Sequence, residues 1–432
     1  TKCSPDHRGP DNVLKFMGWT TVVMALGIST CAAMPKVFGE EVKQTEVWSL
    51  NQEEQDLRNV TNGDVIGERG KDGVWEFHLY TTDGYQEMAN GEMVWVFGYT
   101  HAKGSFKNVG EVTTKEQVEQ MLEPVKVPAD PIHLFVGEKA RITLHNTGMH
   151  CAGEHSGINH VAHTIHFHGL DLTPSVDGVP SLPVDPVLEH TSFTYELLPQ
   201  YEGSFMGHCH VDSFNHILAG MYFPIIIHQD RTKTAYGYKY DRDYTLFVSE
   251  LSSTANEQLQ ETGVVHGIQD WKADYYLING RTFTDNLYNP RSVINDPRSR
   301  IVAYEDETVL LRLMAIGADH VFALHPHGYH MEVIALDGRK LKSSYDKDTL
   351  CIASGERIDV LVKIPHFASQ RKCLSCNFGA GITIMHDHNL RGMVSTGKYP
   401  MGALTIFDVR SKEKVAQPEA PVKGKPYNPL EH

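Results

Sequence analysis

The stretch that decides the fold is GSFMGHCHVDSFNHILAGMYF, residues 203–223, in which Cys209 lies between His208 and His210. Its aromatic and aliphatic residues predict a strand that enters a loop and then a second strand. Successive side chains of a strand point to opposite faces, so Cys209 would face one way and the two histidines the other. We therefore expect three adjacent residues to serve two metal sites.

The composition of the chain is that of a globular protein, except for its histidine content. At 432 residues, with 41% hydrophobic and 22% charged residues, the chain is long enough for two or three domains with cores of their own. Twenty-five residues are histidine, and many form H-x-H pairs. The formal net charge of −15 argues against a nucleic-acid partner, because nucleic acid binds to a basic face.

The N-terminal region contains an uncharged segment, residues 16–34, with Lys15 before it and Glu40 and Glu41 after it. Its length lies between that of a secretory signal and that of a short membrane span, and a buried core helix is the alternative. Basic residues before the segment and acidic residues after it favour export. We predict that residues 1–40 are a signal peptide or an N-terminal membrane anchor, and that the remainder is periplasmic or extracellular.

Short segments of alternating polarity dominate the rest of the chain. In a first unit they cover residues 75–80, 93–100, 132–146, 191–198 and 203–223. In a second unit they cover residues 243–251, 274–280, 307–318, 320–336, 357–364, 381–392 and 402–409. Many short strands separated by turn residues, with almost no amphipathic helix, predict an all-β fold of sandwiches or barrels.

One short helix is expected inside an insertion at residues 102–128. Thr114 followed by Gln117 is the pattern of a capping box and marks the start of a helix. The residues expected on its apolar face are Val118, Met121, Leu122 and Val125.

The two units are related by an internal repeat. HFHG in the first unit aligns with HPHG in the second, and GHCH aligns with MHDH. A repeat of motif and surroundings indicates a duplicated structural unit. We predict a first domain at residues 41–229, a second at 230–410, and an extended tail at 411–432, where four prolines occur.

The histidine pairs predict one metal cluster, and the residues around Cys209 predict a second site. Period-two spacing places both imidazoles of a pair on one strand face, where they can converge on a metal. The four pairs are His166/His168, His208/His210, His325/His327 and His386/His388. One thiolate, two imidazoles and a thioether form the ligand set of a blue-copper centre. The residues that supply it are Cys209, His163, His216 and Met221.

Two features stay open at this stage. Cys373 and Cys376 form a small disulfide, a further metal site or a reduced pair. The loop at residues 147–162 offers an extra metal site, a role in substrate access or only a solvated surface. Its candidate residues are His150, Cys151, His155 and His160.

HTIHFHG, HCH with His216 and Met221, HPHG and HDH resemble the copper-binding motifs of multicopper oxidases, over roughly residues 75–410. The resemblance implies two cupredoxin-like Greek-key β-sandwich or barrel domains in tandem, which bind four coppers per chain. It assigns the type 1 copper to His163, Cys209, His216 and Met221, and the type 2 copper to His166 and His325. It assigns the type 3 pair to His168, His208, His210, His327, His386 and His388.

The second unit departs from this pattern, because Asp387 replaces the cysteine and Phe322 occupies the position that matches His163. No type 1 site is therefore expected there. The chain is similar to two-domain laccase-like oxidases that keep blue copper in the first domain only. In that family the cluster lies between neighbouring subunits of a threefold ring, so the resemblance implies a homotrimer.

The resemblance implies one-electron oxidation of a donor at the type 1 copper and four-electron reduction of O2 to water at a three-copper cluster. Electrons would pass from Cys209 through His208 and His210, and Asp177 would deliver protons. The donor stays open among phenols, Cu(I), Fe(II), Mn(II) and a small redox protein. The alternatives are a copper nitrite reductase and a non-enzymatic copper or electron carrier.

Overall fold

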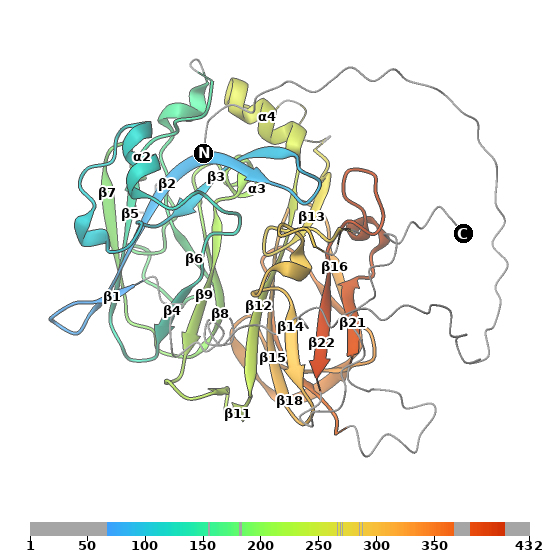
Figure 1. Cartoon of the computed structure of the whole chain (residues 1–432). Coiled ribbons are helices and arrows are strands. Elements are labelled where there is room, and N and C mark those ends of the chain that lie inside the picture. The colour runs from blue at the N-terminus through green and yellow to red at the C-terminus, as the bar shows by residue number, and fades with distance from the viewer. Residues whose placement is uncertain are drawn as a thin grey trace, which may run out of the picture.

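The computed structural model describes residues 67–410, apart from 154–155, 181–183, 266, 268, 270, 285, 287 and 367–380. The predictions for residues 1–40, for the Cys373/Cys376 pair and for the tail at 411–432 lie outside the described residues. Within the described part, the chain forms two β-rich halves that lie side by side (Figure 1). No helix in that part is long and apolar enough to cross a membrane.

The first half contains two sheets. In the larger sheet the strand order is β1-β2-β5-β7, with β3 paired to β2. These strands are β1 (Glu68–Arg69), β2 (Trp75–Glu87), β3 (Met93–Thr100), β5 (Ala140–Asn146) and β7 (Ser192–Leu197). The other sheet has the order β4-β9-β8-β6, formed by β4 (Ile132–Phe135), β9 (Tyr222–His228), β8 (Gly203–His208) and β6 (His166–His168). Aromatic and aliphatic side chains from both sheets form one core between them, because alternate residues of each strand point inward.

The second half also contains two sheets. The first has the order β13-β12-β15-β20-β17-β18 and the second has the order β14-β22-β21-β16-β19. The strands of the first are β12 (Arg242–Leu251), β13 (Tyr275–Ile278), β15 (Thr308–Ile316), β17 (Met331–Leu336), β18 (Arg339–Lys347) and β20 (Arg357–Lys363). Those of the second are β14 (Ile301–Tyr304), β16 (Phe322–Pro326), β19 (Leu350–Ile352), β21 (Gly381–Asp387) and β22 (Leu404–Arg410). A short hairpin, β10 (Thr234–Ala235) with β11 (Tyr238–Lys239), links the halves.

The prediction of an all-β sandwich fold is confirmed, and the pairing agrees with a duplicated unit. Each half has a parallel pair in one sheet, β2–β5 in the first and β12–β15 in the second. Each half also has a parallel pair in its other sheet, β4–β9 and β14–β22. Equivalent strands are therefore joined in the same directions in both halves.

The helices were predicted less well. α2 (Lys115–Met121) begins with the expected capping box between Thr114 and Gln117. It ends earlier than predicted, because Leu122 has extended backbone and is the C-cap, so Val125 does not belong to the helical face. The helices α3 (Ser213–Ala219) and α4 (Ser253–Thr262) were not predicted. Short 3-10 turns are η1 (Phe106–Asn108), η2 (Gly157–His160), η4 (Val293–Asn295) and η6 (Leu390–Met393).

α4 comes after β12 in the second half of the chain but packs against β3, α3 and η2 of the first half. Its Leu259 is buried in the same core cluster as Cys209. α4 therefore covers the end of the first half where Cys209 lies.

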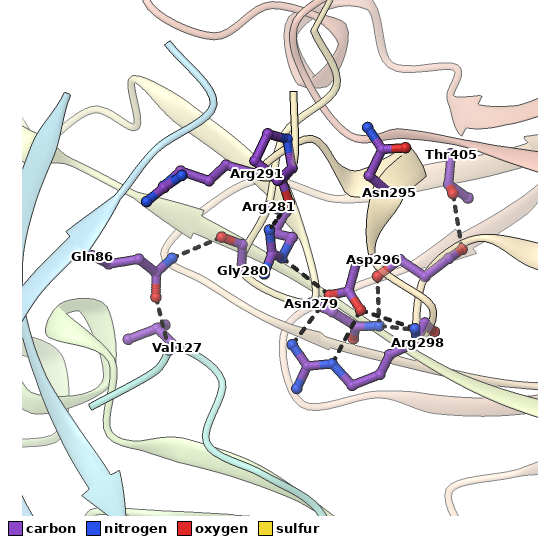
Figure 2. A network of polar contacts seen from close by, with 12 residues as sticks. Gln86, Val127, Asn279, Gly280, Arg281, Arg291, Asn295, Asp296, Arg298 and Thr405 are labelled. Atoms are coloured by element: carbon purple, nitrogen blue, oxygen red, sulfur yellow. Dashed lines mark hydrogen bonds and ion pairs between the residues drawn. The ribbon is translucent and has the colours of Figure 1, made fainter. Parts of the chain in front are cut away.

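A polar network also joins the halves (Figure 2). The Gln86 side-chain amide donates to the carbonyl oxygen of Gly280 at 2.7 Å, and its oxygen accepts from the backbone N–H of Val127 at 3.0 Å. Nearby, the carboxylate of Asp296 pairs with Arg281 and Arg298, each at 3.1 Å. Gly280 has a positive φ of 76°, and a Cβ there would clash with the Val127 carbonyl oxygen, so the junction requires glycine.

Candidate metal centres

The first group of possible ligands surrounds Cys209, which follows directly after β8. Its Sγ lies 3.2 Å from Nδ1 of His216 and 3.9 Å from Nδ1 of His163. All three atoms lie within 4.8 Å of one another. α3 supplies His216, so the seven-residue separation from Cys209 is taken up by a helical turn. We call these three residues the thiol group.

Met221 lies beside the thiol group. Its backbone N–H donates to the carbonyl oxygen of His216 at 3.0 Å, and its own carbonyl accepts from the N–H of Cys209 at 3.1 Å. Its side chain is fully buried in the core cluster that contains Cys209. These bonds hold Cys209, His216 and Met221 together on one short segment of backbone. The loop before β6 supplies His163.

Burial keeps the thiol group uncharged in the absence of a metal. Burial raises the pKa of the Cys209 thiol to about 11 and lowers the pKa of His216 to about 4. The pKa of His163 is held well below its usual value, also by burial. Each imidazole therefore keeps a lone pair for a metal, and the thiol would lose its proton on metal binding. This soft donor set fits copper, whereas Mg²⁺ and Ca²⁺ prefer oxygen ligands.

Four histidines form a second cluster, which we call the first histidine set: His166, His168, His208 and His210. β6 pairs with β8 so that His166 lies directly opposite His208. The ring centroids of these two residues are 5.1 Å apart, and His210 lies 5.3 Å from His166. The predicted two-faced arrangement of the triplet is confirmed. The rings of His208 and His210 lie against His166, while Sγ of Cys209 lies against His163 and His216.

The second half contains an equivalent arrangement, the second histidine set: His325, His327, His386 and His388. β16 pairs with β21 so that His325 lies opposite His386. Nε2 of His327 lies 3.0 Å from Nε2 of His386, so two ring nitrogens already point at one another. His327 and His388 are exposed.

The two sets are oriented by the same kind of hydrogen bond. Nδ1 of His166 donates to the carbonyl oxygen of Asp177 at 2.8 Å, and Nδ1 of His325 donates to that of Asp348 at 2.7 Å. A carbonyl only accepts, so these bonds fix the proton on Nδ1 and leave the lone pair of Nε2 free to bind a metal. His208 and His386 each make the same bond to the carbonyl oxygen of the next residue, at 3.0 Å and 2.9 Å.

Within one chain, the two histidine sets are separate. In the described part of the chain, every ring contact among the eight histidines joins members of the same set. The first set is instead bordered by a loop of the second half, where a Cβ on Gly355 would lie 3.2 Å from the His168 ring. Each chain therefore presents two histidine sets at separate places.

The position that matches Cys209 in the second half holds a carboxylate–imidazole pair. Oδ2 of Asp387 lies 2.5 Å from Nε2 of His320, and both side chains are buried. Asp387 also accepts from the backbone N–H groups of Ala323 and Asn389, and Phe322 packs against the His320 ring. Sequence reasoning missed His320, because it lies five residues before His325, whereas His163 lies three before His166.

Asp177 and the loop at 147–162 have different surroundings. Oδ1 of Asp177 lies 3.5 Å from Nδ1 of His166, so this carboxylate borders the first histidine set.

In the loop at residues 147–162, the backbone N–H groups of His150 and Cys151 donate to Asp83, and His160 pairs with Glu189 at 2.7 Å. Cys151 is disulfide-bonded. His155 lies outside the described residues, and no described residue of this loop belongs to a group of converging ligand atoms.

The chain is similar in sequence to known copper oxidases. Two family profiles, both described as Multicopper oxidase, match residues 111–232 and 242–392, which together make up more than half of the chain. Laccase-1 of Cryptococcus neoformans var. neoformans is 26% identical over 253 residues, 54% of this chain and 40% of that protein. The iron transport multicopper oxidase FET3 of Gibberella zeae is 22% identical over 238 residues, 54% of this chain and 34% of that protein. The chain thus spans well under half the length of these relatives.

Solved structures share the fold. The blue copper oxidase from Nitrosomonas europaea superimposes with a TM-score of 0.59 at 24% identity, covering 82% of this chain and 91% of that one. The multicopper oxidase mgLAC gives a TM-score of 0.58 at 24% identity, with 82% and 92% covered. A copper nitrite reductase from Nitrosomonas europaea gives a TM-score of 0.53 at 18% identity, with 80% and 96% covered. Both halves therefore have the cupredoxin-like fold of these proteins.

Proposed function

Because the chain belongs to the multicopper oxidase family, whose cofactor is copper, we propose that it oxidises a donor by single electrons and reduces O2 to water. The observation that carries this proposal is the triplet at the end of β8. Cys209 belongs to the thiol group, while His208 and His210 belong to the first histidine set. Two copper centres joined through adjacent residues can pass electrons from one to the other.

We propose the copper ligands from the family resemblance, and the two groups of converging side chains support it. His163, Cys209, His216 and Met221 would hold the type 1 copper, which accepts single electrons. By the same resemblance, His166 and His325 would hold the type 2 copper. The type 3 pair would be held by His168, His208, His210, His327, His386 and His388.

The protein's own groups would supply protons and orientation. Reduction of O2 to water consumes protons at the cluster, and Asp177 borders His166 at 3.5 Å with its side chain half-buried. Its carboxylate is therefore placed to pass protons from solvent toward the cluster. The carbonyl oxygens of Asp177 and Asp348 would keep the imidazoles of the two type 2 ligands from rotating.

We propose that the active form is a homotrimer, in which the first histidine set of one chain meets the second set of a neighbour. The separation of the two sets within the chain and the exposure of His327 and His388 support this arrangement. A contact between two different surfaces closes into a ring when the rotation is cyclic. We place the domain boundary between residues 229 and 230, which separates β9 from β10.

We also propose export to the periplasm or the outside of the cell. This proposal rests on the uncharged segment at residues 16–34, which is either cleaved as a signal or retained as a membrane anchor. A copper-resistance protein A of Pseudomonas syringae pv. tomato and several laccases are among the relatives, which suits a protein that meets copper outside the cytoplasm.

Copper analysis combined with oxygen uptake tests the function. Four coppers per chain, with oxygen uptake in the presence of a donor, are expected for the oxidase. One or two coppers without turnover would indicate a carrier, and reduction of nitrite without the cluster would indicate a nitrite reductase.

Replacement of one thiol tests the type 1 assignment. Cys209→Ser is expected to remove the blue absorption and donor oxidation while the histidine cluster still loads copper, because only the thiolate ligand is lost. Cys351→Ser is the matched control, since Cys351 is the other free thiol among the described residues and is exposed. Blue absorption retained in the Cys209 variant would refute the assignment.

A further inference from the structure

The strand that carries His208 is fixed to the second half of the chain by buried polar contacts. β8 packs against β15 and β20. The hydroxyl of its buried Ser204 donates to Oδ1 of Asp359 at 2.6 Å and accepts from Nη1 of Arg312 at 3.2 Å. The position of β8, and with it that of His208, therefore depends on side chains of the second half.

A second arginine of that half, Arg357, reaches the end of the first histidine set. It is the first residue of β20, and its side chain is buried. Its Nε donates to the carbonyl oxygen of Ser204 at 3.3 Å, and its Nη1 donates to that of Gly355 at 2.6 Å. Nη1 also lies 3.3 Å from Oδ1 of Asp337, between β17 and β18. One guanidinium thus joins a strand of the first half to a loop and a turn of the second.

Two glycines allow these groups to approach His168 closely. Gly169 follows His168 directly, and a Cβ there would clash with Nη2 of Arg357. A Cβ on Gly355 would lie 3.2 Å from Cε1 of the His168 ring. The guanidinium therefore lies against the backbone at the end of β6, while the loop that it holds lies against the imidazole.

His168 needs such a support once copper is bound. In the part of the chain that the structure describes, its ring makes one hydrogen bond, from Nδ1 to Nε2 of His208 at 3.3 Å. Nε2 is the nitrogen that His208 has left for copper, because its Nδ1 donates to the carbonyl oxygen of Cys209. Copper binding would thus remove the bond to His168, and packing against Gly355 would remain to orient the ring.

We propose that Arg357 is a positioning residue for the copper cluster. It holds the Gly355 loop against the His168 ring and fixes the ends of β6 and β8, so that His168 and His208 keep the orientation in which they bind copper. The inference rests on the proposed function and adds to the first histidine set a group from the second half of the same chain. Arg357 acts on the cluster and not on the thiol group.

The shape of a guanidinium suits this role. Its five N–H groups lie in one plane and point in several directions, whereas the ammonium group of lysine has three donors on a compact head. In Arg357, Nε and Nη1 donate to carbonyl oxygens that belong to different halves. The side chain of its carboxylate partner, Asp337, is 56% exposed, so water screens the attraction between the two charges. The two carbonyl bonds therefore define where the guanidinium lies.

Copper titration of the copper-depleted protein tests the inference. Arg357→Ala is expected to lower the copper affinity of the cluster by about 10- to 100-fold, as when other groups that orient a metal ligand are removed. The copper bound per chain and the near-ultraviolet absorption of the type 3 pair report on the cluster. The type 1 copper, followed by its blue absorption, should bind with unchanged affinity, because Cys209 faces His163 and His216 on the other side of the triplet.

Arg357→Lys separates shape from charge. This variant keeps the positive charge but cannot donate to both carbonyl oxygens, so its cluster should also lose affinity. Full copper affinity in Arg357→Lys would show that charge alone matters and would overturn the positioning role.

Arg300→Ala is the matched control. Arg300 is 7% exposed and Arg357 is 4% exposed, and Arg300 forms an ion pair with Asp408 at 2.5 Å. Both alanine variants should lose stability, but only Arg357→Ala should lose copper affinity at the cluster. The inference would be overturned by an equal loss of cluster affinity in both variants, by an equal loss at the cluster and at the type 1 copper, or by no loss in either variant.

A smaller change tests the same contact without removing a buried charge. Gly355→Ala places a methyl group against the His168 ring, so it should weaken copper binding at the cluster and alter the near-ultraviolet absorption of the type 3 pair. Gly397→Ala is its control, because Gly397 has a φ of 76° and no atom within 4 Å of a Cβ. Equal cluster spectra and affinities in the two glycine variants would refute the contact, even if Arg357→Ala does not fold.

These experiments distinguish the inference from the proposed function. A wild-type protein that binds four coppers and reduces O2, with unchanged cluster affinity in Arg357→Ala and Gly355→Ala, keeps the function and loses the positioning role. A wild-type protein that binds no copper at the cluster loses the function and the inference together.

Discussion

At the scale of single residues, the sequence located the candidate ligands but not the groups that orient them. The histidine pairs stand out because period-two spacing puts both rings on one strand face. Asp348, by contrast, acts through its backbone carbonyl, and any residue type supplies a carbonyl. Arg357 and the carbonyl oxygen of Ser204 meet only through the packing of the two halves, which residue spacing does not reveal. Partners that depend on packing or on backbone atoms leave no mark in a sequence motif.

The Asp387–His320 pair is expected to stabilise the second half. Asp387→Ala would leave the buried ring nitrogen of His320 and two partly buried backbone N–H groups without the carboxylate that accepts from them. We expect a loss of about 3 kcal/mol in the free energy of unfolding, as for other buried pairs from which one partner is removed. Chemical denaturation measures it. Asp346→Ala, on the exposed strand β18, is the control and should change stability by less than about 0.5 kcal/mol.

A loss of the same size in both aspartate variants would show that the Asp387–His320 pair does not stabilise the fold more than an exposed aspartate does. The type 1 absorption offers a second readout, because the thiol group lies in the other half. It should be unchanged in Asp387→Ala as long as the protein is folded.

At the scale of secondary-structure elements, the strands were predictable and two helices were not. β5 alternates between buried and partly buried residues, whereas β8 and β9 are buried throughout. Alternation and short apolar runs bounded by turn residues are both visible in a sequence. α4 is mostly polar and buries only Ala255, Asn256 and Leu259, so it has no clear apolar stripe. α3 interrupts a run that is apolar and aromatic throughout, which masks helical periodicity. Both helices depend on the surfaces they cover, and those surfaces exist only in the folded chain.

The junction between β2 and β13 is expected to tolerate no side chain at Gly280. Gly280→Ala would combine a positive φ with a clash against the Val127 carbonyl, and should destabilise the protein by about 3 kcal/mol. Gly73→Ala isolates the backbone effect, because Gly73 has a φ of 80° and no atom within 4 Å of a Cβ. That control should lose only about 1 kcal/mol. Thermal or chemical unfolding measures the stability of both variants. An equal loss of stability in the two would show that the clash with the Val127 carbonyl adds nothing to the backbone effect.

At the scale of the whole molecule, the repeat was readable from the sequence, but the relation between its copies was not. HFHG and HPHG aligned, and their strands do pair in the same way with GHCH and MHDH. The distance between the two histidine sets depends on how the halves pack, which is governed by contacts such as that of Gln86 with Gly280. These residues are far apart in the sequence and belong to no motif.

Mixed subunits test the trimer. One chain carries His166→Ala and His168→Ala in the first histidine set, and the other carries His325→Ala and His327→Ala in the second set. Neither should reduce oxygen alone. After unfolding and refolding together in equal amounts, about a quarter of the interfaces in a ring would join two intact sets, so activity should return to about that fraction. A cluster formed within one chain would give no recovery.

The exposure of His327 and His388 in the second histidine set also affects the purification of the protein and its loading with metal. An isolated chain presents two exposed imidazoles of this set, His327 and His388, and exposed imidazoles are what immobilised nickel retains. Newly made or dissociated chains should therefore stick to a nickel resin without any added tag, while assembled rings pass through. In the cell the same surface would collect whichever divalent ion is most available before assembly, so subunit concentration would influence which metal the finished clusters contain.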